Sequence, residues 1–187
     1  SDPTMPEDTG WLPSHLPGGA NAVLADTRWG EGALAALRLA RKAGVPGVLD
    51  ADRKPPHPDL VATASHVAFS QQALREVSGE DDPRAGLAKV AEGASNWLAV
   101  TLGKEGVLFV DNGTVAQIPA FAVETVDTLG AGDVWHGAFA LALAEEQSER
   151  AAIRFASAAA AIKCTRFGGR LGAPRRDEIE RFLAANG

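Results

Sequence analysis

Residues 127–133 of this chain read Asp-Thr-Leu-Gly-Ala-Gly-Asp, and this stretch decides how the rest of the sequence is interpreted. An apolar run at 121–126 precedes it, and a segment rich in alanine and leucine at 132–145 follows it. The pattern predicts a strand that passes directly into a long helix. The small residues 130–132 let a ligand approach the backbone closely, and the free N–H groups and dipole of a helix start favour an anion. The stretch therefore predicts an anion-binding strand-to-helix junction.

Asp133 falls in the first turn of this predicted helix. An acidic residue at that position is ordinary chemistry for a helix N-terminus. Beside a bound phosphate, the same carboxylate can accept a proton from an attacking hydroxyl, which contributes about 10²- to 10⁴-fold to a rate. Other phosphate motifs do not fit, since the chain has no GxxxxGK[ST] loop and Trp135 stands where GxGxxG needs its third glycine. Asp133 is therefore a candidate general base.

Outward from this junction, short apolar runs alternate with helical patterns along the chain. Helices end or begin at typical signals, such as Gly44 after 31–43. The alternation predicts one α/β domain, residues 1–187, built on an open, mainly parallel sheet flanked by helices. We expect strands at 21–26 (short and buried), 45–50, 66–69, 97–102, 106–110 and 115–118. We expect a proline-rich loop at 55–58 and helices at 31–43, 71–77, 83–94, 132–145, 148–163 and 175–185.

Composition narrows the classes of function. The chain has 187 residues, of which 45% are hydrophobic, enough for one domain with a core. Its net charge of −6 argues against a general nucleic-acid or anionic-membrane binder. The single cysteine, Cys164, excludes an internal disulfide, and no apolar run approaches the roughly 20 residues of a membrane span. We expect a soluble, cytoplasmic protein without a signal peptide; residues 1–4 fit native chain and an added segment equally well.

The stretch 127–133 resembles the DTxGAGD signature of the PfkB/ribokinase family of carbohydrate kinases, and the resemblance extends from about Asn21 to the C-terminus. Residues 101–106 (Thr-Leu-Gly-Lys-Glu-Gly) resemble the family's TxGxxG nucleotide turn. Residues 155–161, followed by the glycines at 168 and 169, resemble its adenine-covering helix and loop. The resemblance implies a ribokinase-like fold without the N-terminal third and lid, that is, a C-terminal fragment of a kinase of about 300 residues, inactive alone.

The resemblance also implies a reaction, in which the γ-phosphate of ATP moves to a hydroxyl of a sugar or sugar-like small molecule. Asp133 would contact that substrate as the base, and the backbone amides of Gly130, Ala131 and Gly132 would bind the transferring phosphate. Mg²⁺ would accompany the ATP, and a monovalent cation such as K⁺ would lie on carbonyls near Asp127, Leu129 and the loop 168–172. Residues implied at the nucleotide side are Thr101, Gly103, Gly106, Ser157, Gly168, Asp127 and Leu129.

The chain departs from the family pattern in two places. Residues 70–73 read Ser-Gln-Gln-Ala where many members have N-x-x-E, so magnesium would rely on water and on Asp50 or Asp52. Trp135 and His136 stand where many members have Phe-Asn. Purely structural explanations of several of these residues stay open. Residues 101–106 would then form a plain hairpin, His136 would be a packed or exposed histidine, and Ser157 would lie in a close-packing face. A solvated basic face would account for Arg166, Arg170, Arg175 and Arg176.

Two other functions stay open beside the sugar kinase. One is a non-catalytic nucleotide-binding module, if this chain is the whole protein. The other is a dinucleotide-using enzyme, which the missing glycine of GxGxxG counts against. The expected partner is a small-molecule sugar, with no nucleic acid and no membrane. An uncovered sheet edge predicts self-association, with a homodimer as one option.

Overall fold

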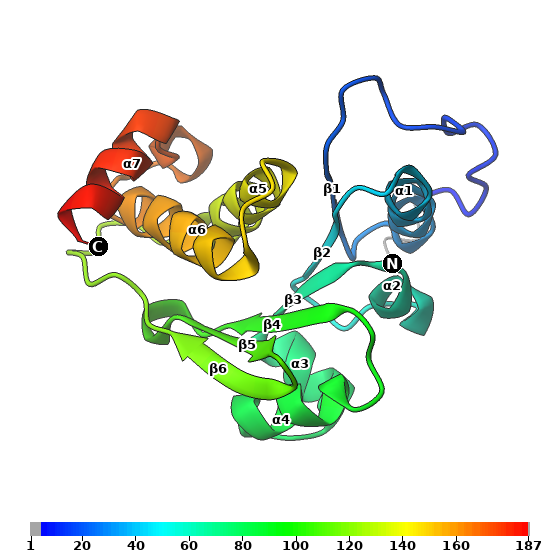
Figure 1. Cartoon of the computed structure of the whole chain (residues 1–187), viewed down its shortest axis with the longest axis horizontal. Coiled ribbons are helices and arrows are strands. Elements are labelled where there is room, and N and C mark those ends of the chain that lie inside the picture. Colours follow the sequence, from blue (N-terminus) through cyan, green and yellow to red (C-terminus); the bar gives the residue numbers. More distant parts are fainter. Residues whose placement is uncertain (1–4, 187) are drawn as a thin grey trace. The chain divides into compact units, whose positions relative to one another are not determined.

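The computed structural model describes residues 5–186, so residues 1–4, whose origin the sequence leaves open, lie outside the described residues. The chain divides into two compact units (Figure 1). We call the part up to Leu102 together with residues 108–117 the sheet unit. Residues 103–107 and those from Ile118 onward form the helical unit.

Six strands form one sheet in the order in which they occur in the chain. The first four pair in parallel, with Leu24 opposite Val48 and Ala68 opposite Ala99. The last two are joined through Asn112 and Gly113, both at positive φ, and so short a connection joins antiparallel strands. This confirms the predicted open, mainly parallel sheet. The strands are β1 (Val23–Asp26), β2 (Gly47–Ala51), β3 (His66–Ser70), β4 (Trp97–Thr101), β5 (Val107–Asp111) and β6 (Thr114–Ile118).

The helices of the sheet unit begin and end at recognisable signals. Gly44 closes the first with φ 71°, and its N–H donates to the last carbonyls. Ser70 and Asp82 each accept a hydrogen bond from a backbone N–H in the first turn of the helix that follows. These helices pack against the strands around fully buried side chains such as Leu37 and Phe69. They are α1 (Gly30–Ala43), α2 (Pro58–Thr63), α3 (Gln71–Ser78) and α4 (Pro83–Ala91).

Two local predictions for the sheet unit were wrong. The proline-rich segment is only partly a loop, because Pro58 occupies the first turn of α2, where proline is tolerated. Leu60 then packs, fully buried, into the core. The first strand is not buried throughout: β1 lies at the end of the strand order, and Leu24 is 42% exposed.

Up to residue 186, the helical unit contains three helices and two 3₁₀ turns, Gly103–Glu105 and Gly169–Gly172. Small buried alanines of α6 (Glu149–Cys164), among them Ala156 and Ala159, let α5 (Ala131–Ala144) approach closely, as expected for a close-packing face. Trp135 of α5 stacks on Phe139, with ring centroids 5.0 Å apart. The helices are α5 (Ala131–Ala144), α6 (Glu149–Cys164) and α7 (Arg176–Ala185). No helix within residues 5–186 is long and apolar enough to cross a membrane.

The strand predicted at 121–126 is absent, so α5 follows a loop rather than a strand. The rings of Phe121 and Phe182 meet in a T-shaped contact with their centroids 5.2 Å apart, whereas Val126 is 60% exposed. The backbone N–H groups of Val126 and Asp127 both donate to the carbonyl of Cys164 at the end of α6. Those hydrogen bonds take the place of a strand partner and hold the loop against α6.

Candidate functional site

The Asp127 carboxylate joins two loops of the helical unit. One oxygen accepts the Leu129 N–H at 2.9 Å, and the other accepts the N–H groups of Gly168 (3.0 Å) and Gly169 (3.4 Å). These backbone donors, the Leu129 amide above all, hold the pKa of Asp127 well below its usual range. The segment 127–130 and the turn 168–172 therefore lie together, as the resemblance implied for Asp127, Leu129 and Gly168.

Lys163, in the last turn of α6, completes this arrangement. Its side chain is fully buried. The Nζ atom donates to the backbone carbonyl of Asp127 at 2.7 Å and lies 3.2 Å from the Asp127 carboxylate. A buried ammonium is tolerable only with such partners. The sequence analysis missed this residue. The signal that could have indicated it is a lysine directly after the mainly small and apolar residues 155–162.

The first turn of α5 offers open backbone donors. Gly130 precedes the helix at φ 74°, a conformation that suits glycine, and the Ala131 N–H is used by the Thr128 carbonyl. The N–H groups of Gly132 and Asp133 have no acceptor within residues 5–186, as is usual in a first turn. A Cβ atom on Gly132 would meet nothing within 4 Å. This side of the turn is therefore open, and the two amides are free to donate to an anion.

Asp133 stands beside this open turn with an exposed side chain. One of its carboxylate oxygens lies 3.8 Å from the position that a Cβ on Gly130 would take. A hydroxyl group can therefore reach the carboxylate from solvent. His136, one turn along α5, is 5% exposed and bonds through Nδ1 to the Gly132 carbonyl at 2.8 Å. It is a packed histidine.

Ser157 lies away from solvent in the contact between α5 and α6. It is 7% exposed, and its hydroxyl accepts a hydrogen bond from the Trp135 indole at 3.3 Å. The structure therefore gives Ser157 a packing partner inside the helical unit. A nucleotide contact through this residue stays a prediction.

The residues of the turn 101–106 have different surroundings. Thr101 ends β4 in the sheet unit, and its hydroxyl donates to the Phe69 carbonyl at 3.4 Å. Gly103, in the helical unit, has φ 58°, and a Cβ atom added there would meet nothing within 4 Å. A Cβ on Gly106 would lie 2.1 Å from the Ile118 carbonyl oxygen. Gly106 is therefore required by the packing of the chain itself, as in the plain-hairpin interpretation.

Several ionic groups outside this site pair with one another. In the sheet unit, Asp52 accepts the Thr27 hydroxyl at 2.8 Å and pairs with Arg28 at 3.0 Å. In the helical unit, Arg166 pairs with Glu178 and Arg176 with Glu145, so the predicted basic face is partly neutralised. Over the described part of the chain, 5–186, no group of three or more His, Cys, Asp or Glu side chains is placed to hold a metal ion.

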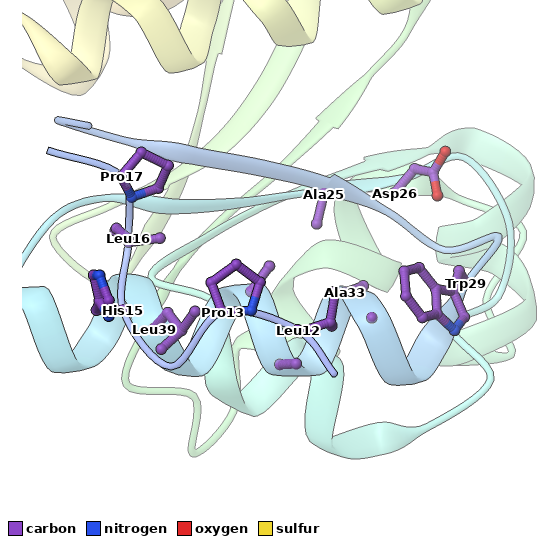
Figure 2. Close-up of a pocket in the computed structure, with 13 residues that line it drawn as sticks. Leu12, Pro13, His15, Leu16, Pro17, Ala25, Asp26, Trp29, Ala33 and Leu39 are labelled. Atoms are coloured by element: carbon purple, nitrogen blue, oxygen red, sulfur yellow. The ribbon is translucent and has the colours of Figure 1, made fainter. Parts of the chain in front are cut away.

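A pocket of about 380 Å³ lies in the sheet unit, between the segment 12–17 and α1 (Figure 2). Leu12, Leu16 and Leu39 line it, and Asp26 contributes a carboxylate at one end. An apolar pocket with an acidic group does not suit a phosphate. The helical unit therefore contains the better candidate for an anion site.

Residues 15–176 match the model of the pfkB family of carbohydrate kinases. The chain belongs to this family. It is 46% identical to the ribokinase of Bacillus subtilis over 87 residues, which are 46% of this chain and 30% of that protein. The match confirms the family that residues 127–133 predicted.

Solved ribokinases share the fold. The ribokinase of Thermotoga maritima has a TM-score of 0.76 and 29% identity, covering 88% of this chain and 57% of that one. The Arabidopsis thaliana ribokinase, determined with ribose and ATP, has a TM-score of 0.78 and 26% identity, covering 94% and 61%. The chain therefore has the ribokinase-like fold, but spans about a third of the curated relatives it matches and just over half of these two structures.

Proposed function

We propose that this chain supplies the nucleotide-binding and catalytic part of a sugar kinase, which moves the γ-phosphate of ATP to a hydroxyl of a sugar or sugar-like small molecule. One observation carries the proposal. The exposed carboxylate of Asp133 lies in the same helical turn as two backbone N–H groups that have no acceptor within residues 5–186. A base and an anion pocket side by side are what phosphoryl transfer to a hydroxyl requires.

In the proposed reaction, Asp133 accepts the proton as the substrate oxygen forms its bond to the γ-phosphorus. The bond from that phosphorus to the bridging oxygen of ADP breaks, and ADP leaves with the electron pair. The amides of Gly132 and Asp133 donate to the phosphoryl oxygens, whose charge must be stabilised in the transition state. The open space above Gly132 lets the phosphate come close enough for those bonds.

Nucleotide binding is supported by the kinship with ribokinases, one of which was determined with ribose and ATP. The residues proposed on this side are Thr101, Gly103 and the turn beginning at Gly168. Mg²⁺ would neutralise phosphate charge in the reaction. It commonly keeps several waters and takes one or two carboxylates plus substrate phosphates, so a site without a preformed cluster within 5–186 fits that use.

The test combines binding and transfer. Calorimetry on this chain should show binding heat with Mg²⁺–ADP and none with NAD, the matched control. The intact protein that contains this chain should release ADP in the presence of a sugar, with ribose as the first sugar to try because the relatives are ribokinases. The product is identified by phosphorus NMR as a phosphate monoester. ADP binding without transfer to any sugar of a broad panel would instead establish the non-catalytic nucleotide-binding module.

A further inference from the structure

A lysine already occupies the Asp127 side of the place expected for a monovalent cation. The family resemblance put such an ion on carbonyls near Asp127 and Leu129 and on the loop 168–172. In the structure, Nζ of Lys163 lies 2.7 Å from the Asp127 carbonyl oxygen and 3.2 Å from the Asp127 carboxylate. We infer that the Lys163 ammonium is a built-in substitute for the monovalent cation, and that this protein needs no bound K⁺ or Na⁺.

The lysine side chain is enclosed by the packing around α6. Its side chain is fully buried, and its Cε atom lies 3.5 Å from where a Cβ on Gly172 would be. The aliphatic part therefore runs from α6 against the turn 169–172 and delivers the charged end to Asp127. A free cation bound to the same carbonyl would meet the ammonium at close range and be repelled.

The ammonium can do the work of an ion here. It neutralises Asp127, whose carboxylate holds the amides of Leu129, Gly168 and Gly169, and it fixes the Asp127 carbonyl directly. Both effects hold the segment that leads into Gly130 and the open first turn of α5. Lys163 is thus a positioning residue for the anion pocket and does not contact substrate. Because it is covalently attached, its occupancy does not depend on the salt present.

Two substitutions separate an ion substitute from a mere buried ion pair. Lys163→Ala removes the charge and leaves room for an ion beside Asp127. Lys163→Met removes the charge but keeps a chain of similar length, so no ion can enter. Lys89→Ala is the control, because Lys89 is an exposed lysine paired with Glu80 at 2.8 Å in the sheet unit.

Melting temperatures in potassium, sodium and tetramethylammonium chloride at equal ionic strength give the first readout. The unchanged protein and Lys89→Ala should melt at the same temperature in all three salts. Lys163→Ala should melt lower in tetramethylammonium and recover in potassium or sodium, whereas Lys163→Met should be lower without recovery. A potassium response of the unchanged protein or of Lys163→Met would overturn the inference, and so would a folded Lys163→Ala that responds to no salt. If Lys163→Ala does not fold, Lys163→Ser, which also leaves room for an ion beside Asp127, takes its place, and a potassium response of the unchanged protein would still overturn the inference.

Turnover of the intact protein gives the second readout, and this part rests on the proposed kinase function. The unchanged enzyme should work equally in all three salts. Lys163→Ala should lose turnover and regain roughly tenfold with potassium, within the usual range of coupling between two ligands. Potassium activation of the unchanged enzyme would contradict the inference. Failure of all variants to phosphorylate any sugar, with the expected melting pattern, would reject the kinase and leave the lysine substitution standing.

Discussion

Gly106 and Gly132 belong to two turns that both resemble motifs of one kinase family, yet the structure uses the two glycines for opposite purposes. A Cβ on Gly106 would lie 2.1 Å from the Ile118 carbonyl oxygen and 2.7 Å from the Ala120 nitrogen. A Cβ on Gly132 would meet nothing within 4 Å. The first glycine is needed because the chain packs on itself, and the second leaves space that the chain does not fill. A motif glycine therefore indicates a ligand only where its surroundings are open.

The two turns also differ in what holds them. The turn 101–106 is closed by an uncharged backbone bond, from the Gly106 N–H to the Gly103 carbonyl at 3.1 Å. The segment 127–130 is held by the Asp127 carboxylate and by the buried ammonium of Lys163. Charge-assisted bonds are stronger than neutral ones, but they depend on protonation. The contrast leads to predictions about turnover, folding and acid.

Asp133→Asn should have the largest effect, on the chemical step of the intact protein. Asparagine keeps the size and tolerates a helix start, but it cannot accept the proton. We expect kcat to fall by about 10²-fold or more, with nucleotide affinity and melting temperature nearly unchanged, because the anion pocket consists of backbone amides. Loss of turnover with retained binding marks an interaction needed in the transition state.

The measurement is kcat, nucleotide Kd and Tm on one preparation. Asp177→Asn is a suitable control, since Asp177 is an exposed first-turn aspartate of α7. If Asp133→Asn lowers the melting temperature while turnover per folded molecule survives, the carboxylate only supports the helix and the base lies elsewhere.

Alanine at each of the two glycines should separate packing from access. Gly106→Ala combines φ 96° with a backbone clash, so it should lower the free energy of unfolding by at least about 2 kcal/mol. Gly132 lies in a helical turn, where alanine is more stabilising than glycine by up to about 1 kcal/mol. The methyl group of Gly132→Ala would, however, enter the space proposed for the phosphate. It should keep or raise stability and weaken binding of a non-hydrolysable Mg²⁺–ATP analogue, which carries the γ-phosphate that ADP lacks.

Urea unfolding and calorimetry on both variants make this comparison. A well-folded Gly106→Ala would mean that the chain can shift away from the added methyl group. Unchanged affinity of Gly132→Ala for the ATP analogue would place the transferring phosphate away from this turn.

The sequence predicted the elements well where local signals and burial agree. Gly44 ends α1 as expected, and Ser148 begins α6 by accepting the Ala151 N–H. The pattern failed at 121–126, because an apolar run does not specify its partner: here the amides at the end of the run bond to the Cys164 carbonyl rather than to a strand. Six strands and the long helices could thus be predicted, but not which edges and loops remain exposed.

The site was predictable in part for a similar reason. Small residues and Asp133 at a helix start can be identified from spacing, since the geometry of a first turn is local. The role of Lys163 depends on a contact with Asp127, 36 residues earlier in the chain, and nothing local predicts it. The burial of Ser157 against Trp135 likewise arises from the packing of α5 on α6.

Lowering the pH should have the smallest effect on stability, and it should distinguish the segment 127–130 from the turn 101–106. The folded-state pKa of Asp127 is lowered from its ordinary 3.8, mainly by the Leu129 amide. Its contribution to stability is therefore present above that ordinary value and is lost as pH falls through the lower folded-state value. Glu178, whose pKa its bond to Arg166 lowers from 4.5 to about 2, acts in the same direction, so a Glu178→Gln background isolates Asp127.

Amide hydrogen exchange in that background, corrected for its intrinsic pH dependence, provides the measurement. As pH falls from the ordinary value of 3.8 toward the lower folded-state pKa of Asp127, protection of the Leu129 and Gly168 amides should decrease, because the proton binds first to the opened form and so favours opening. The Gly106 amide donates to a neutral carbonyl and should keep its protection until the protein unfolds globally. Asp127→Asn should abolish the difference in pH dependence. If all three amides lose protection together in the Asp127 protein, the segment 127–130 is held by packing, as the turn 101–106 is, rather than by charge.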